Sequence, residues 1–467
     1  MPPSDPITVA TEPANSTAEQ TRRLAQRHVR HFLADFAALE KRYPGAYPRV
    51  ITRGLGAYLF DDAGRRLLDA GNHLGAGQVG HGRAEIAERM AQQVTELEFA
   101  ALDSGVSHVK VTELAVRLAG MVPLDDPVFS FTSSGSEANE LAFKLARAYH
   151  ARRGEPDRVL ILSRDGSYHG SSLAGMAATG SEPFKSGFGP LPPAFESFSQ
   201  PSPGRCGFCE RAGGCTLDCA DALETAIRQH GAGRVAAVIA EPVAILQAVK
   251  VPHERYWPRV QDICRENGVL LILDEVVTGF GRTGRMFGAQ HWDIRPDIMT
   301  LAKGLTSGYA PMGATAVARH VEDAFSAGPL LHLNTYAGHP LACEAALATL
   351  DILERERLAE HAGELESTLA GGLARLGRIT DRVLRVSALG LLSSVELDVS
   401  DRPDAAALMV DLRHQMYEHG LIARCALGNG ILTVVVYPTL VITRDEVATA
   451  TRLLGEALDV VFAEAGS

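Results

Sequence analysis

The sequence predicts an α/β protein with a large domain, built on a mostly parallel sheet between helices, and a smaller α+β domain. Short apolar runs alternate with helical stretches from residue 128 to residue 302, which is the pattern of repeated β-α-β units. The C-terminal part has a different pattern, because helical stretches frame two strand-like runs there. A chain of 467 residues with 46% hydrophobic residues can bury more than one core.

The individual elements follow from local patterns. Residues 21–42 carry apolar side chains at helical spacing, and the turn signal Asp61–Gly64 separates two short strands. Buried strands are expected where a short aliphatic run is bounded by glycine or a charge. We expect strands at 58–60, 66–69, 128–131, 159–162, 235–240, 269–273, 297–302, 392–397 and 432–436, and helices at 21–42, 85–97, 110–121, 137–153, 254–266, 340–354, 358–376, 405–419 and 444–462.

These elements divide the chain into domains. Residues 1–20, rich in Pro, Ser and Thr, are expected to form a disordered tail. Residues 21–74 and 336–467 are assigned to the small domain. Residues 75–335 are assigned to the large domain, which contains a Pro- and Gly-rich insertion at about 182–218.

Composition limits the partners of the protein. The net charge of -11 argues against nucleic acid or an anionic membrane as the main partner. No stretch has the length and apolarity of a membrane span, and residues 1–20 lack the apolar core of a signal peptide. We therefore expect a cytoplasmic protein.

Two predicted strands end in oppositely charged residues. The run Val269–Leu273 is followed by Asp274, and the run Asp297–Ala302 is followed by Lys303. Ligands of open α/β sheets bind beyond the carboxyl ends of the strands, so both side chains should enter one crevice. A lysine in an apolar pocket readily forms an imine, and an acid nearby can keep a pyridine nitrogen protonated, as pyridoxal phosphate (PLP) catalysis requires. On these two residues alone, a buried ion pair is the simpler interpretation.

Three other segments follow strands in the same way. Ser134, Gly135 and Ser136 lead into a helix, whose first amide groups suit a dianionic phosphate; the alternative is an ordinary helix cap by Ser136, and the two are compatible. Tyr168 follows the strand at 159–162 and would stack on a planar ring, although a core tyrosine is the better interpretation of that residue alone. Glu241 ends the strand at 235–240 and adds a third acid to the crevice.

The segment Gly279–Gly284 fits the dinucleotide fingerprint G-x-G-x-x-G and follows a strand. That fingerprint requires a helix to begin at the glycines, and the next residues, Arg285–Gly288, are poor helix formers. We interpret the match as accidental. It is the basis of an alternative function, a nicotinamide-dependent oxidoreductase.

Taken together, these segments resemble the class III PLP-dependent aminotransferases, which have fold type I. The resemblance extends over nearly the whole chain beyond the tail, in order and with the spacing of the family. Each segment alone is a weak signal, whereas the ordered set is highly specific. The matching segments are Ser134–Asn139, Tyr168–Gly170, Glu241–Pro242, Asp274–Val276, Thr278–Gly284, Ala302–Gly304, Asn334–Pro340 and Tyr437–Leu440.

The resemblance implies a fold and a set of roles. The fold would be a seven-stranded type of sheet with a smaller second domain, in a homodimer with active sites at its interface. Lys303 would form the Schiff base and move the proton, while Asp274 would hold the ring nitrogen. Glu241 would support Asp274, and Arg424 would pair with a substrate carboxylate. The cofactor-binding residues would be Ser134, Gly135, Ser136, Tyr168, His169, Asp274, Val276, Lys303 and, from the neighbouring subunit, Thr335.

Two features depart from the common family pattern, and the first is Gly75–Gly77. Members that accept amines often carry a bulky aromatic residue there. We interpret Gly75 as a sign of a roomier substrate pocket. A glycine turn without influence on specificity is an equally good interpretation.

The second departure is a cluster of four of the seven cysteines, within the insertion. Their proximity suggests a tetrahedral thiolate site, for zinc by default or for an iron–sulfur centre. The alternatives are reduced thiols or a disulfide. We expect a structural clip on a surface loop, formed by Cys206, Cys209, Cys215 and Cys219.

The sequence therefore predicts a PLP-dependent aminotransferase. It would move an amino group from an amine or ω-amino acid to a 2-oxo acid such as pyruvate or 2-oxoglutarate, in two half-reactions. An aminomutase, racemase or decarboxylase on the same scaffold is the first alternative. A nicotinamide oxidoreductase and a non-catalytic binding protein are more remote.

Overall fold

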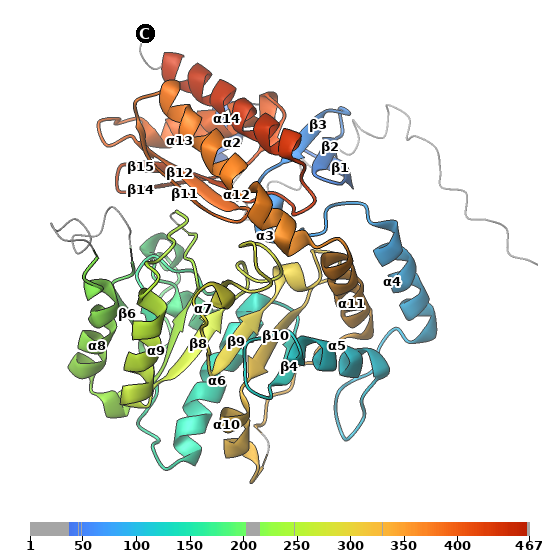
Figure 1. Ribbon diagram of the computed structural model, residues 1–467, viewed down its shortest axis with the longest axis vertical. Helices are drawn as coiled ribbons and strands as arrows, with labels where there is room; N and C mark the ends of the chain where they lie inside the picture. The colour runs from blue at the N-terminus through green and yellow to red at the C-terminus, as the bar shows by residue number, and fades with distance from the viewer. Residues whose placement is uncertain are drawn as a thin grey trace, which may run out of the picture.

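The computed structural model describes residues 37–464, apart from residues 45, 48, 202–214, 247 and 329. Figure 1 shows a larger lobe built around one sheet, with a smaller lobe above it that carries the C-terminal helices. The first strands of the chain also lie in the smaller lobe. No helix in the described part of the chain has the length and apolarity needed to cross a membrane.

A seven-stranded sheet, in the order β4-β10-β9-β8-β7-β5-β6, forms the centre of the larger lobe. Strands β5 to β9 run parallel to one another, whereas β10 is antiparallel to both of its neighbours. Strands β7, β8 and β9 are buried over their whole length, which explains their continuous apolar sequences. The strands are β4 (Val128–Thr132), β5 (Leu160–Arg164), β6 (Phe195–Phe198), β7 (Val235–Ala240), β8 (Leu270–Asp274), β9 (Ile298–Leu301) and β10 (Gly313–Val317).

Alternating side chains of these strands build a core on each face of the sheet. Ile161 and Ile272 pack on one face with residues of α6. Their neighbours Leu162 and Leu271 belong to the core on the other face, together with residues of α8 and α9. The sheet is therefore covered by helices on both faces. The helices of this lobe are α6 (Gly135–Arg152), α7 (Leu173–Ala178), α8 (Asp218–His230), α9 (Tyr256–Asn267) and α10 (Arg319–Glu322).

The smaller lobe contains two four-stranded sheets, one of which joins N-terminal and C-terminal strands of the described chain. The sheet β1-β2-β3-β13 pairs N-terminal strands with β13, parallel to β3, and the sheet β11-β12-β15-β14 is antiparallel. This lobe confirms the predicted α+β architecture. Its elements are α2 (Ala37–Arg42), β1 (Ile51–Leu55), β2 (Tyr58–Asp61), β3 (Arg66–Asp69), α12 (Leu358–Ala374), β11 (Val383–Leu389), β12 (Leu392–Asp398), α13 (Ala405–Glu418), β13 (Leu421–Ile422), β14 (Arg424–Gly428), β15 (Ile431–Val436) and α14 (Arg444–Glu464).

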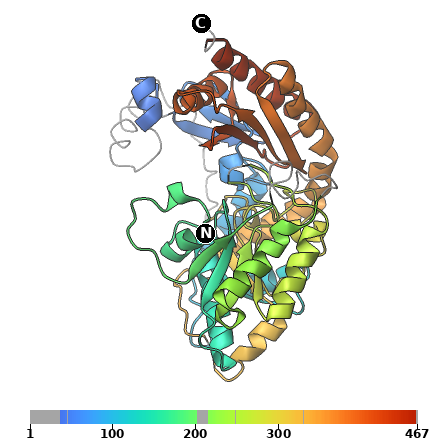
Figure 2. The same ribbon diagram turned by 90° about the vertical axis from the view of Figure 1, so that its left-hand side faces the viewer.

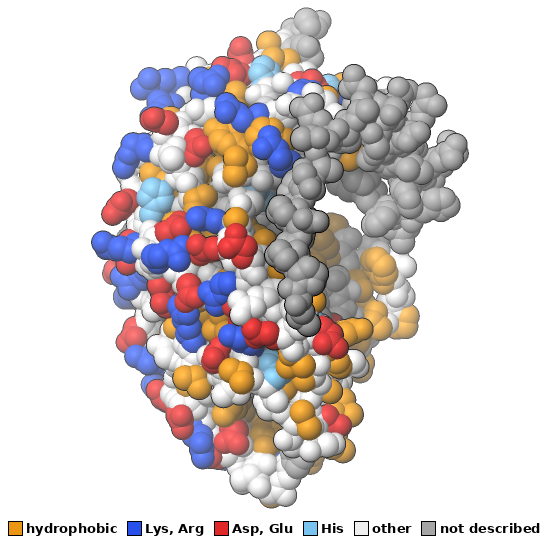
Figure 3. All heavy atoms as spheres, turned by 90° about the vertical axis from the view of Figure 1, so that its right-hand side faces the viewer, with side chains coloured by type: hydrophobic (Ala, Val, Ile, Leu, Met, Phe, Trp, Pro, Cys, Tyr) orange, Lys and Arg blue, Asp and Glu red, His pale blue; other side chains and the backbone are white. Residues whose placement is uncertain are grey.

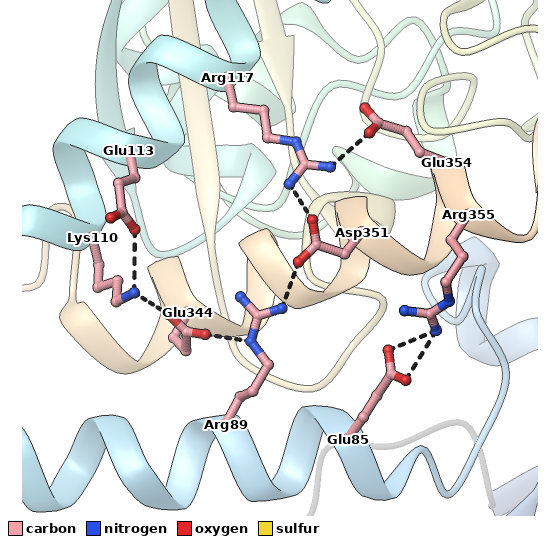
Figure 4. Close-up of polar contacts among 9 residues, drawn as sticks. All are labelled: Glu85, Arg89, Lys110, Glu113, Arg117, Glu344, Asp351, Glu354 and Arg355. Carbon is pink, nitrogen blue, oxygen red and sulfur yellow. Dashed lines mark hydrogen bonds and ion pairs between the residues drawn. The ribbon is translucent and has the colours of Figure 1, made fainter.

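The remaining α-helices of the described residues are α3 (Asn72–Gly75), α4 (Ala84–Glu96), α5 (Val109–Ala119) and α11 (Pro340–Arg355). Charged residues fasten α4 and α5 to α11, because Arg89 and Arg117 both pair with Asp351 (Figure 4). Acidic and basic side chains are interspersed over much of this side of the molecule (Figure 3). Single exposed ion pairs contribute little to stability, so the attachment of α4 and α5 to α11 depends on the network of charges as a whole. They are Glu85, Arg89, Lys110, Glu113, Arg117, Glu344, Asp351, Glu354 and Arg355.

Most predicted elements are present, with ends shifted by a few residues, and three differences are informative. The helix predicted at 21–42 is found over Ala37–Arg42, and the rest of it lies outside the described residues. The insertion at 182–218 is more than a surface loop, since β6 pairs in parallel with β5 at the edge of the central sheet. The sequence analysis also missed β10, because its small residues give no strand signal and are buried by the strands on either side.

Candidate active site

Asp274 and Lys303 line the same cavity, at neighbouring strand ends. Asp274 is the last residue of β8, and Lys303 follows β9 as the first residue of the short three-ten helix η4 (Lys303–Leu305). The cavity has a volume of about 610 Å³. Its wall includes most of the residues that the sequence had singled out: Ser134, Gly135, Ser136, Tyr168, His169, Glu241, Asp274, Val276, Lys303 and Arg424.

The buried carboxylate of Asp274 is held by three partners. Asn139 Nδ2 donates to Oδ2 at 2.9 Å, His169 Nδ1 lies 2.8 Å from the same oxygen, and the Val276 amide donates to Oδ1 at 3.1 Å. Burial alone would raise the pKa of Asp274, but the interactions with His169 and Asn139 outweigh it and lower the pKa below its ordinary value. Asp274 therefore keeps its negative charge and can stabilise a cationic ring nitrogen.

Lys303 is prepared for nucleophilic chemistry. Burial lowers its pKa to about 8, although the charge of Asp274 opposes the shift. Its φ of 43° lies in the left-handed region, which costs energy for any residue except glycine and is often found at functional sites. At neutral pH, a useful fraction of Lys303 is thus in the neutral form that attacks carbonyls.

The start of α6 forms a cradle of small residues. Ser134, and not Ser136, caps the helix, since its Oγ accepts a hydrogen bond from the Glu137 amide at 3.2 Å. A Cβ at Gly135 would lie 2.9 Å from Val276 Cγ2, so the backbone approaches the opposite wall too closely for a larger residue. The first amide groups of a helix have no partner within it and suit a bound phosphate.

Glu241 lies near His169 and makes no direct contact with Asp274, so its predicted supporting role stays a prediction. Its Oε2 lies 3.1 Å from Arg164 Nη2 and 3.9 Å from His169 Nε2. Its Oε1 accepts a hydrogen bond from the Tyr168 amide at 3.2 Å. Arg164, Glu241, His169 and Asp274 are all buried, but 3.9 Å is too long for a hydrogen bond between Glu241 and His169. The side chains that hold Asp274 directly are therefore Asn139 and His169.

Arg424 brings a positive charge to the cavity from the smaller lobe, as the first residue of β14. Its Nη1 donates a long hydrogen bond, 3.4 Å, to the carbonyl oxygen of Ile245. No carboxylate among the described residues pairs with this guanidinium. It is therefore available for the carboxylate of a substrate.

Comparison with known proteins decides the family. The family model for class III aminotransferases matches residues 40–458. This chain belongs to the class III aminotransferases.

Curated relatives and solved structures that are similar to this chain are also aminotransferases. An uncharacterised aminotransferase of Bacillus subtilis is 38% identical, over 79% of this chain and 81% of its own length. A putrescine–pyruvate aminotransferase of Pseudomonas aeruginosa is 32% identical, over 95% and 97%. The crystal structure of an (S)-enantioselective ω-transaminase of Thermomicrobium roseum is 36% identical with a TM-score of 0.87, covering 97% of this chain and 100% of that one. The protein is thus a PLP-dependent enzyme that transfers amino groups to 2-oxo acids, and its fold is type I.

The cavity of this aminotransferase fits PLP by its own features. A cradle of glycine and serine at a helix start suits the phosphate, Asp274 suits the pyridine nitrogen, and Lys303 suits the aldehyde. The cradle is closed on a second side, because a Cβ at Gly170 would lie 2.8 Å from Ser136 Oγ.

The nicotinamide alternative is wrong for a class III aminotransferase. No helix begins at the glycines of the Gly279 loop. The loop folds around the buried carboxylate of Glu275, which accepts hydrogen bonds from the amides of Gly288 at 3.0 Å and Ala289 at 2.7 Å. Burial raises the pKa of Glu275 to about 7 despite these bonds.

Two predicted site residues do not line the cavity within this chain. A Cβ at Gly75 would lie 3.5 Å from the Tyr437 ring and from Val277 Cγ1, so a larger side chain there would extend toward cavity residues. Thr335 is exposed and outside the cavity lining. It stands in an exposed apolar segment with Leu331 and Leu333, which are 90% and 86% exposed.

The structure describes only half of the cysteine cluster. Cys206 and Cys209 lie outside the described residues. Cys219 is buried in the first turn of α8, where it packs in the main core, and Cys215 is half-buried just before that helix. No group of three metal-binding side chains occurs among the residues that the structure describes. The four-cysteine metal site stays a prediction.

Sequence reasoning did not single out several residues of the site. Asn139 belongs to the segment Ser134–Asn139, one helical turn after Gly135 in α6. That helical spacing could have indicated that its side chain lies on the same face as the phosphate cradle. Arg164 ends β5 next to β7, so only the strand pairing brings it to Glu241. Phe184 lines the cavity from the insertion, and no sequence signal marked it.

Proposed function

We propose that this aminotransferase is a homodimeric enzyme of the ω type, which takes its amino group from an amine or ω-amino acid. Pyruvate or 2-oxoglutarate would be the acceptor. The names of two relatives, a putrescine–pyruvate aminotransferase and an ω-transaminase, support this class of donor. The observation that carries the proposal is the presence of Asp274, Lys303 and Arg424 around one cavity, with no carboxylate of the described chain paired to Arg424.

Three sets of residues of this chain would hold the cofactor in place. Ser134, Gly135 and Ser136 bind the phosphate at the start of α6, while Tyr168 and Val276 contact the faces of the ring. His169 orients Asp274, whose carboxylate holds a proton on the pyridine nitrogen. When bound, PLP supplies an electron sink for the electron pair left on the substrate carbon.

Lys303 has two tasks. Its Nζ would hold the cofactor, and the lowered pKa of this group favours the neutral amine that such attachment requires. The same Nζ would act as the general base and acid that moves the proton of the substrate carbon. A pKa of about 8 suits both directions of this transfer near neutral pH.

Arg424 serves the second half-reaction. A 2-oxo acid carries a carboxylate beside the reacting carbonyl, and the guanidinium binds it with two parallel hydrogen bonds. An amine without a carboxylate needs no such partner. The single long hydrogen bond to Ile245 leaves Arg424 able to change position between the two substrates.

The active unit would be a homodimer in which Thr335 of the partner subunit completes the phosphate site. The exposed apolar residues of the segment around Thr335 support a partner surface: Leu331 is 90%, Leu333 86% and Tyr336 60% exposed. Dilution of the enzyme should therefore release cofactor as the dimer dissociates. Light scattering combined with cofactor absorbance measures both quantities.

The function is tested by supplying an amine donor without any acceptor. The donor should convert the bound cofactor to its aminated form in stoichiometric amount, seen as loss of the yellow absorbance, with release of one carbonyl product per site. Pyruvate added afterwards should restore the absorbance. A decarboxylase, racemase or aminomutase would turn over the donor without accumulating the aminated cofactor, and that result would overturn the proposal.

A further inference from the structure

The lining of the cavity also includes apolar residues, which we call the apolar wall. This wall contains Leu74, Phe184, Val243, Ile245, Leu246 and Tyr437. Leu74 is 64% and Phe184 41% exposed, so these two stand where the cavity meets solvent. We expect a donor amine to place the rest of its structure against these apolar residues, because the polar residues of the cavity are the ones proposed to hold the cofactor.

Neither carboxylate of the cavity is available to a second positive charge. Among the described lining residues only Glu241 and Asp274 carry carboxylates. Glu241 is engaged by Arg164 and by the Tyr168 amide, and Asp274 by three donors of its own. A second ammonium group placed against the apolar wall would therefore lose part of its hydration without gaining a counter-charge from the described lining residues, which is unfavourable.

Phe184 is placed to define this wall. Its ring meets the Tyr168 ring edge-on, with the centroids 5.3 Å apart, so it extends the aromatic surface from the proposed cofactor contact toward the entrance. The loop that carries it, between α7 and β6, stands out on the left of Figure 2. The hydrogen bonds that hold it include one from the Phe184 amide to the Ser181 carbonyl at 3.1 Å and one from Lys185 Nζ to the Ala177 carbonyl at 3.1 Å.

We propose that Phe184 is a specificity-determining residue that selects donors with an apolar substituent over donors that carry a second ammonium group. The inference rests on the proposed function of the same cavity. It sets this enzyme apart from a diamine aminotransferase, although one relative acts on putrescine by name. Phe188, in the same loop, is a suitable control residue, because it is 64% exposed and does not line the cavity.

The test compares two donors of equal length, n-pentylamine and putrescine, with pyruvate as acceptor. The holoenzyme should use pentylamine with a kcat/KM at least about 100-fold above that for putrescine, since the donors differ only by a methyl against an ammonium group. Equal use of the two would overturn the inference but leave the aminotransferase function intact. Failure of every amine to convert the cofactor would instead overturn the proposed function.

Variants assign the selection to Phe184. Phe184→Ala should raise KM for pentylamine about tenfold with little change in kcat, and Phe184→Leu should restore most of the loss. Phe184→Glu should raise kcat/KM for putrescine about tenfold, because it supplies the missing counter-charge. Phe188→Ala and Phe188→Glu are the matched controls and should leave both donors unchanged.

Two measurements separate specificity from a loss of structure. The cofactor absorbance and the KM for pyruvate should be the same in all Phe184 variants as in the wild type. If Phe184→Ala and Phe188→Ala have equal effects, or if Phe184→Ala lowers the use of both donors by the same factor, the role of Phe184 is refuted.

Discussion

The two sides of the cavity differ in how they are built. On the side of Asp274 and Lys303, the residues stand at the ends of buried strands, and Asp274 has three fixed partners. On the side of Phe184 and Arg424, they come from a partly exposed loop and from the smaller lobe, and Arg424 has one long hydrogen bond. The difference indicates that the fold fixes the chemistry, whereas the substrate can be changed by substituting a few loop residues.

The strongest test of this contrast is Asp274→Asn. The amide keeps the size of the side chain but removes the charge that stabilises the ring nitrogen, so kcat/KM should fall about 1,000-fold for every donor. The loss should be independent of the donor, because Asp274 acts on the chemistry and not on selection. Steady-state kinetics with pentylamine and an ω-amino acid measure it. A loss confined to one donor would show that Asp274 takes part in donor selection, which would contradict this account.

Arg424→Ala should act on one half-reaction only. Loss of a two-pronged bond to a carboxylate costs about 2 kcal/mol, so KM for pyruvate should rise about 30-fold. The half-reaction with pentylamine should change less than about threefold, because that donor has no carboxylate. Arg424→Lys keeps the charge and should lie between these values. Equal effects on the two half-reactions would contradict the assigned role.

The cofactor side should also show a pH dependence set by Lys303. Its pKa is lowered by burial to about 8, so the neutral, reactive form is the minor one below that pH and the major one above it. Uptake of PLP by the apoenzyme should therefore be about tenfold faster at pH 9 than at pH 7. Stopped-flow absorbance measures the rate. A rate that falls with rising pH would show that the lysine is not poised as described.

The smallest effect is expected at Gly75, on the substrate side. Its φ of 84° is disfavoured for other residues, so Gly75→Ala should lower the free energy of unfolding by about 1 kcal/mol in urea denaturation. A Cβ there would meet Tyr437 at an ordinary contact distance, so small donors should be used as before and bulky ones a few-fold less well. An unchanged preference between small and bulky donors would mean that Gly75 serves the turn alone.

The same contrast explains what the sequence could predict. Asp274 and Lys303 were found because each follows a recognisable buried strand, and the strand ends of such a sheet lie together. Arg164 and Phe184 were missed because their partners are brought to them by strand pairing and loop packing, which no local pattern records. Thr335 could be named only through the family, since its proposed site belongs to a second copy of the chain.

Covalent attachment of the cofactor to Lys303 is the claim on which the chemistry depends. Reduction of the holoenzyme with borohydride fixes any such bond, and peptide mass spectrometry then locates it. We predict the cofactor mass on the peptide that contains Lys303, with no labelled peptide from a Lys303→Ala variant. A label on another lysine, such as Lys185 in the loop beside the cavity, or the same label in the variant, would contradict the account.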